Sequence, residues 1–194
     1  MSYTPRTLEA LKLVMDLHHD QKRKGTDIPY ITHLWAVAAI VGENGGDEDQ
    51  VIGALLHDII EDQGDKITLE KIIEQFGNRV EEIVKGCTDA DSKEKAASKD
   101  DPEEWRKRKQ RYIDHLRPAP PYVKLVSAAD KLHNARAIVA DLRCEGPNVW
   151  KRFKAGADDQ LWYYRGIVGA LKHEWSSPVL DELDRMVEDM ARLA

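Results

Sequence analysis

The sequence lacks the features that mark exported and membrane proteins. No apolar run approaches the roughly 20 residues that a membrane-spanning helix needs. The N-terminus, MSYTPRTLEA, has neither a basic start nor an apolar core, so it predicts no secretion signal. Only two cysteines are present, Cys87 and Cys144, and their spacing indicates neither a metal site nor a disulfide framework. These absences predict a cytoplasmic protein with no membrane partner.

An excess of positive charge is also missing. The chain has 29 Lys and Arg against 35 Asp and Glu, which gives a formal net charge of −6. This balance argues against a nucleic-acid partner. It does not exclude a small polyanionic ligand, provided that a local basic cluster and a metal ion offset the overall negative field.

Nothing in the sequence is typical of a β-strand, whereas helix signals occupy nearly the whole chain. Thr4 followed by proline, and Asp101 followed by proline, are favoured helix starts. The chain has 194 residues, enough for one domain with a substantial core. We therefore expect an all-α fold, a single compact helical domain over residues 1–194. The charged, apolar-poor segment 91–100 is predicted to be a mobile loop.

The stretch 51–62, VIGALLHDIIED, combines apolar and ionisable residues in one predicted helix. At about 100° per residue, its leucines and isoleucines share one face, while His57 lies over Glu61 and Asp58 over Asp62 on the other. One imidazole and three carboxylates on one patch are costly unless positive charge offsets them. A metal ion such as Mn, Fe, Zn or Mg would do so. A solvated acidic face on an ordinary amphipathic helix fits the same pattern equally well.

Two residues elsewhere are candidates for the same site, but neither is decisive alone. His33 ends the segment PYITH, and a lone histidine is more often structural than a ligand. Asp130 shares a predicted helix face with Asn134 in SAADKLHNAR. An aspartate in this position could bind a metal, or could equally accept from a backbone N–H or pair with a lysine.

The order of these residues along the chain resembles that of a known family. His33, then His57-Asp58, then Asp130 is similar to the ligand order of the HD superfamily of metal-dependent phosphohydrolases, which are all-helical. More narrowly, the chain resembles the hydrolase domain of the RelA/SpoT family, in particular the small stand-alone alarmone hydrolases. The motifs that carry the resemblance are HxxQKRKGT (18–26), PYITH (29–33), ALLHDIIED (54–62), FGNRV (76–80) and ADKLHN (129–134).

The resemblance implies a role for each matching residue. Glu61 and Asp62 match the acidic pair that positions and activates the attacking water. Lys131, beside Asp130, and Tyr163, in LWYYRGIVGAL, are further candidates for substrate contact, although such an aromatic is more often part of a core. The metal ligands, usually for Mn(II) in this family, would be His33, His57, Asp58 and Asp130. The substrate-binding residues would be Arg23, Lys24 and Asn134.

The implied activity is removal of the 3′-pyrophosphate from a guanosine or adenosine alarmone, and no length remains for a synthetase domain. Phosphate-ester hydrolysis needs a Lewis acid and a group that takes the proton of water, which a metal and a carboxylate provide. Two alternatives stay open, an HD phosphohydrolase of ordinary nucleotides and a catalytically inactive nucleotide sensor. The QKRKGT and FGNRV segments favour alarmones, and the complete set of ligand and acidic residues disfavours a sensor.

Some positions depart from the family pattern. Leu34 follows His33, where proline is common in the family. Ala137 stands where several long members have a threonine near the nucleotide base of the substrate. These departures leave the preference for guanine or adenine open. The physiological metal, the oligomeric state (a homo-oligomer included) and regulation are open as well. The basic helix 105–112, WRKRKQRY, is expected to present a solvated face rather than to reach the substrate.

Overall fold

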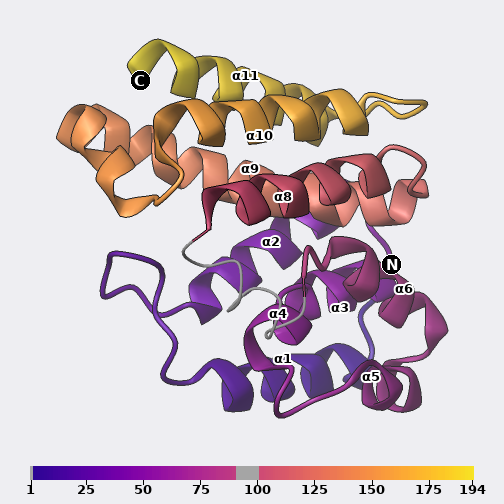
Figure 1. Cartoon of the computed structure of the whole chain (residues 1–194). Helices are drawn as coiled ribbons and strands as arrows, with labels where there is room; N and C mark the ends of the chain where they lie inside the picture. Colours follow the sequence, from indigo (N-terminus) through magenta and orange to yellow (C-terminus); the bar gives the residue numbers. More distant parts are fainter. Residues whose placement is uncertain (1, 91–100) are drawn as a thin grey trace.

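The computed structural model describes residues 2–90 and 101–194, so the mobile loop predicted at 91–100 lies outside the described residues. Over these ranges the chain forms helices and no β-strand, with one isolated bridge between Lys22 and Pro29. This confirms the predicted all-α fold (Figure 1). The helices are α1 (Pro5–His18), α2 (Ile31–Glu43), α3 (Glu48–Leu56), α4 (Ile59–Gln63), α5 (Leu69–Phe76), α6 (Asn78–Cys87), α8 (Pro102–Leu116), α9 (Pro121–Glu145), η1 (Gly146–Arg152), α10 (Gly156–Leu171) and α11 (Pro178–Leu193).

Local capping explains where several helices begin. The Thr4 hydroxyl accepts a hydrogen bond from the backbone N–H of Arg6, and the Asp101 carboxylate accepts from two backbone N–H groups at the start of α8. At α3, Asp47 and Gln50 form a reciprocal capping box. Each cap satisfies N–H groups that the first turn of a helix leaves without a partner. The predicted starts of α1 and α8 are confirmed.

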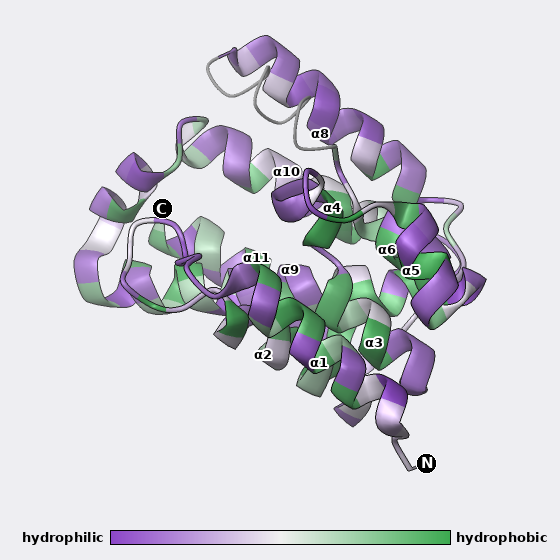
Figure 2. Ribbon diagram, turned by 90° about the horizontal axis from the view of Figure 1, so that it is seen from below, coloured by the Kyte–Doolittle hydropathy of each residue, from purple (hydrophilic) through white to green (hydrophobic). Residues whose placement is uncertain are grey.

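Helix α9, with 25 residues, is the central element of the fold. It packs against α11 on one side and against α2, α3 and α6 on the other, as the arrangement in Figure 1 shows. Ala128, Ala129 and Ala135 are fully buried along it, and their small side chains let neighbouring helices come close. Hydrophobic residues are concentrated on the inner helices, whereas α8 is mostly hydrophilic (Figure 2). Any polar residue on α9 between these layers is therefore buried.

The prediction of one continuous helix over 51–62 is wrong. Helix α3 ends at Leu56, residues His57 and Asp58 form a turn, and α4 begins at Ile59. Asp58 has φ −97° and ψ 0°, in the sparsely populated bridge region rather than the helical one. The hydroxyl of Tyr30, from another part of the chain, donates a hydrogen bond to the Asp58 carboxylate. Tertiary contacts thus hold the turn that sequence periodicity could not reveal.

The segment between α1 and α2 folds back on itself and carries the predicted basic residues. The backbone N–H of Arg23 donates to the carbonyl of Ile28 at 2.9 Å, and that of Tyr30 donates to the carbonyl of Gln21 at 2.8 Å. Gly25 turns the loop with a φ of +74°, and a side chain here would lie 3.2 Å from Cδ of Arg152.

None of the helices in the described ranges is long and apolar enough to span a membrane.

Candidate metal centre and adjoining cavity

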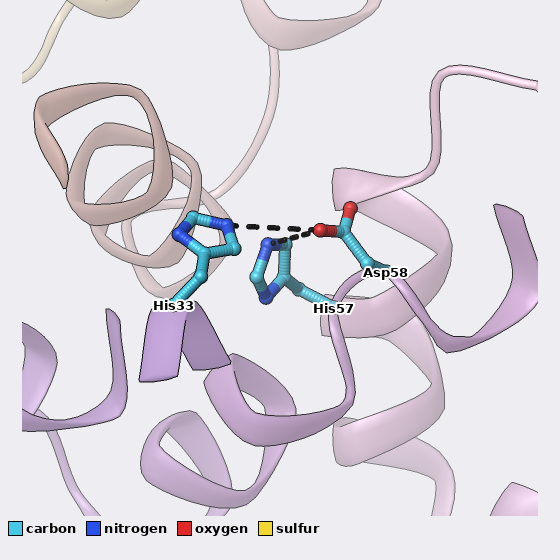
Figure 3. Close-up of side chains that lie close together, drawn as sticks. All are labelled: His33, His57 and Asp58. Carbon is cyan, nitrogen blue, oxygen red and sulfur yellow. Dashed lines mark ion pairs between the residues drawn. The ribbon is translucent and has the colours of Figure 1, made fainter. Parts of the chain in front are cut away.

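The four predicted metal ligands meet at one point, although they come from three separate parts of the chain. Nε2 of His33 lies 3.7 Å from Oδ2 of Asp58 and 3.2 Å from Oδ1 of Asp130. Nε2 of His57 lies 3.0 Å and 3.6 Å from the same two oxygens. The two rings and the Asp58 carboxylate point toward one another (Figure 3). Donors about 2.1 Å from one ion lie roughly 3.0–3.4 Å apart, so this spacing suits a single metal ion.

The hydrogen bonds behind the two histidines prepare their Nε2 atoms for a cation. Nδ1 of His57 lies 2.8 Å from the carbonyl oxygen of Ala54, which can only accept, so Nδ1 carries the proton. The Nε2 of His57 is buried and has no hydrogen-bond partner among the described residues. Nδ1 of His33 lies 2.8 Å from Nδ1 of His133. Burial chiefly, with nearby cations, lowers the pKa of His133 to about 4, so its neutral ring can accept from His33.

Electrostatics also favour a positive charge at this point. Burial by itself would lower the pKa of His57, but the carboxylates of Asp58 and Asp130 outweigh it and raise that pKa well above its usual range. Burial would likewise raise the pKa of Asp130, but Lys131 and the two histidines hold it well below its usual range. Nζ of Lys131 lies 2.5 Å from Oδ2 of Asp130. The acids therefore stay ionised, and the donor set of two imidazoles and two carboxylates fits a divalent metal.

The predicted acidic pair lies on α4, which begins directly after Asp58. Oε1 of Glu61 accepts a hydrogen bond of 2.7 Å from the backbone N–H of Asp89. Oδ2 of Asp62 accepts one of 2.6 Å from the side-chain amide of Gln21. Each carboxylate is thus oriented by a donor from a different segment. The backbone N–H of Asp62 donates to the carbonyl of Asp58 at 2.9 Å, so Asp62 lies one helical turn after Asp58.

A cavity of about 370 Å³ adjoins the predicted metal ligands and contains all five predicted substrate-binding residues. The guanidinium of Arg23 donates to the side-chain oxygen of Asn134 at 2.9 Å, and the amide of Asn134 donates to Asp130 at 2.6 Å. The hydroxyl of Tyr163 is buried and has no hydrogen-bond partner among the described residues. The predicted residues in the lining are Arg23, Lys24, Lys131, Asn134 and Tyr163.

The prediction of a solvated basic face on helix 105–112 is wrong for two residues. Arg108 is 6% exposed, and both Arg108 and Lys109 form ion pairs with the buried carboxylate of Asp89. Lys109 lines the cavity, with Nζ 4.6 Å from the centre of the Tyr163 ring. The sequence does place these residues on one helix face. Spacings of three and four residues separate Trp105, Arg108, Lys109 and Tyr112. Because Arg108 and Lys109 are basic, the sequence did not indicate that this face is turned toward the rest of the protein.

Sequence reasoning also missed Tyr30, Arg152 and Phe153. Tyr30 lines the cavity and donates to Asp58, and its ring packs against His33 with centroids 5.4 Å apart. Nζ of Lys24 lies 5.4 Å from the centre of the Phe153 ring. Arg152 is the last residue of the short helix η1 and Phe153 comes directly after it, and no sequence pattern predicted this helix. Their position in the cavity depends on contacts between distant segments.

Comparison with known proteins agrees with this geometry. The profile of the HD domain family matches residues 10–160, so the chain belongs to the HD domain family. Within it, the chain is homologous to enzymes of the MESH1 and SpoT type. It is 37% identical over 146 residues to the "Guanosine-3′,5′-bis(diphosphate) 3′-pyrophosphohydrolase MESH1" of Xenopus tropicalis, covering 74% of this chain and 73% of that protein.

Other relatives are longer, and solved structures share the fold. The chain is 36% identical over 151 residues to the "Putative GTP diphosphokinase RSH1, chloroplastic" of Arabidopsis thaliana, covering 71% of this chain but only 16% of that protein. A structure titled "A metazoan ortholog of SpoT hydrolyzes ppGpp and plays a role in starvation responses" superposes with a TM-score of 0.76, at 26% identity and 97% coverage of both chains. The lmo0812 structure from Listeria monocytogenes gives a TM-score of 0.69 at 32% identity, covering 80% of this chain and 96% of that one.

Proposed function

We propose that this chain is a metal-dependent 3′-pyrophosphohydrolase of alarmone nucleotides, (p)ppGpp, (p)ppApp or both. The observation that carries the proposal is the convergence of His33, His57, Asp58 and Asp130 beside a cavity lined by basic side chains. The names of the MESH1 relatives support the same reaction. We further propose Mn(II) as the metal, residues 1–194 as one HD domain, and a nucleotide rather than nucleic acid as the partner.

Each part of the site has a role in this reaction. His33, His57, Asp58 and Asp130 would hold the metal, which when bound supplies a Lewis acid and lowers the pKa of water. Glu61 and Asp62 hold the attacking water and take its proton. The basic residues of the cavity hold the phosphates, which places the inner 3′-phosphorus for in-line attack. The water oxygen bonds to that phosphorus, the bond to the ribose 3′-oxygen breaks, and that oxygen receives a proton.

This mechanism predicts that the 3′ phosphates leave together as pyrophosphate, with the 5′ phosphates unchanged on the nucleotide product. A time course of ppGpp hydrolysis followed by phosphorus NMR tests it directly. Orthophosphate appearing first, or loss of 5′ phosphates, would contradict the mechanism and favour an HD phosphohydrolase of ordinary nucleotides.

The Arg23 variant tests the role of the cavity in substrate binding. In the same assay Arg23→Ala should mainly raise KM, because it removes a contact made before the transition state. Arg117→Ala, an exposed arginine at the end of α8, is the matched control.

The side chain of Gln21 connects three residues around the acidic pair. Its amide donates to Asp62, and its oxygen lies 2.7 Å from Nδ1 of His18 and 3.1 Å from the amide of Gln63. Gln21→Met should lower kcat by about tenfold or more while the metal stays bound, since outer partners of catalytic groups typically contribute that much. Turnover at saturating substrate and metal content measure this. The exposed neighbour change Lys22→Met should leave both unaltered, and an unchanged kcat in Gln21→Met would refute the role.

A further inference from the structure

The cavity has two ends, and helix α9 runs from one to the other. Asp130 belongs to the metal centre, Asn134 lies one turn further, and Ala137 and Ile138 lie two turns further. Asp141 is on the next turn, about 16 Å along the helix axis from Asp130 at about 1.5 Å per residue. The loop after α1 runs along the cavity in the same direction as α9. Arg23 contacts Asn134 near the metal centre, while Lys24 and Gly25 lie against Phe153 and Arg152 at the far end.

Asp141 carries a negative charge in a cavity whose other charged side chains are positive. Five of the lining side chains are cationic, and among the described residues Asp141 is the only acidic one. A carboxylate repels phosphate, so it contributes nothing to binding that part of a ligand. Its Oδ2 accepts a 2.6 Å hydrogen bond from the guanidinium of Arg152, which fixes its direction. Each carboxylate oxygen can accept two hydrogen bonds, so Asp141 still has acceptor capacity for an N–H donor.

The surroundings of Asp141 suit a planar heterocycle. Ala137, Ile138 and Phe153 line the same end of the cavity and offer apolar and aromatic surface. Apolar and aromatic surface with a few oriented polar groups is the usual form of a small-molecule site. We propose that Asp141 selects guanine over adenine in the substrate, an inference that rests on the proposed function. Guanine presents N1–H and its 2-amino group side by side, and a carboxylate accepts from both, whereas adenine presents an N1 lone pair that the carboxylate repels.

Substrate preference tests this directly. The wild-type kcat/KM should be at least about tenfold higher for guanosine than for adenosine 3′,5′-bis(diphosphate), and Asp141→Asn should reduce that ratio about tenfold or more, the usual effect of one bidentate base contact. The change should lie in KM, with a gain for adenosine, because an amide can donate to N1 and accept from the 6-amino group. A purely structural loss would weaken both substrates alike.

Glu145→Gln provides the matched control. Glu145 is the other carboxylate that Arg152 contacts, and it does not line the cavity. This variant should keep the wild-type ratio. If the ratio in Asp141→Asn equals that of the wild type, or if the wild type shows no guanine preference, the inference is wrong.

Mononucleotide binding separates this inference from the proposed function. Calorimetry with GDP and ADP, which carry no 3′-pyrophosphate, should show tighter binding of GDP that depends on Asp141. Asp141-dependent GDP preference without any pyrophosphate release from an alarmone would support the base site and reject the hydrolase. Release of pyrophosphate from both alarmones with equal efficiency, together with equal binding of GDP and ADP, would support the hydrolase and reject the base site.

Discussion

Replacing His57 by alanine is expected to remove the divalent metal and lower turnover by at least about 1,000-fold. The purified wild-type protein should contain about one divalent metal per chain. A Lewis acid at a phosphoryl oxygen contributes several kcal/mol of transition-state stabilisation, and each 1.4 kcal/mol is about a tenfold change in rate. Nε2 of His57 lies 3.0 Å from Oδ2 of Asp58 and 3.6 Å from Oδ1 of Asp130, so His57→Ala removes one of the four convergent donor atoms.

Elemental analysis and turnover with added Mn(II) measure the effect. His115→Ala, an exposed histidine on α8, should keep both the metal and the activity. Full metal content in both His57→Ala and Asp130→Ala would exclude the proposed centre. Chelation of the wild-type protein followed by titration with several divalent ions tests the proposal of Mn(II). Higher activity with another ion would keep the site but reject manganese.

Neutralising either acid of α4 should separate catalysis from metal binding. Glu61→Gln and Asp62→Asn keep the size of the side chain but remove the base that takes the proton of water. Turnover should fall at least about 100-fold, a typical general-base effect. Metal content and thermal stability should stay close to wild type, because neither acid is among the four residues proposed to hold the metal.

The matched control for this pair is Asp65→Asn. Asp65 follows α4 and is exposed to solvent, so its neutralisation should leave turnover unchanged. Wild-type turnover in both Glu61→Gln and Asp62→Asn would show that the pair is not catalytic. Loss of the metal in either variant would instead place that acid among the ligands.

Local interactions are the part of this fold that the sequence determined. The caps at Thr4 and Asp101 act within three residues along the chain, so side-chain chemistry alone predicts where α1 and α8 begin. The order His33, His57-Asp58, Asp130 is likewise a property of the chain itself, and its resemblance to known proteins indicated the family, whereas helix signals along the chain predicted the all-helical class. These features need no knowledge of how distant segments pack.

Tertiary structure decided everything that depends on contact between distant residues. The helix predicted over 51–62 breaks at Asp58, whose carboxylate accepts from Tyr30 far upstream. Lys109 is partly buried beside the cavity, where it forms an ion pair with Asp89, whereas helical periodicity treats lysine as a solvated residue. Asp141 is a candidate for recognising the nucleotide base because Arg152, at the end of η1, donates a hydrogen bond to its carboxylate and orients it. Side-chain patterns record which face of a helix is apolar, but the partner of each polar group is set by the packing of separate helices.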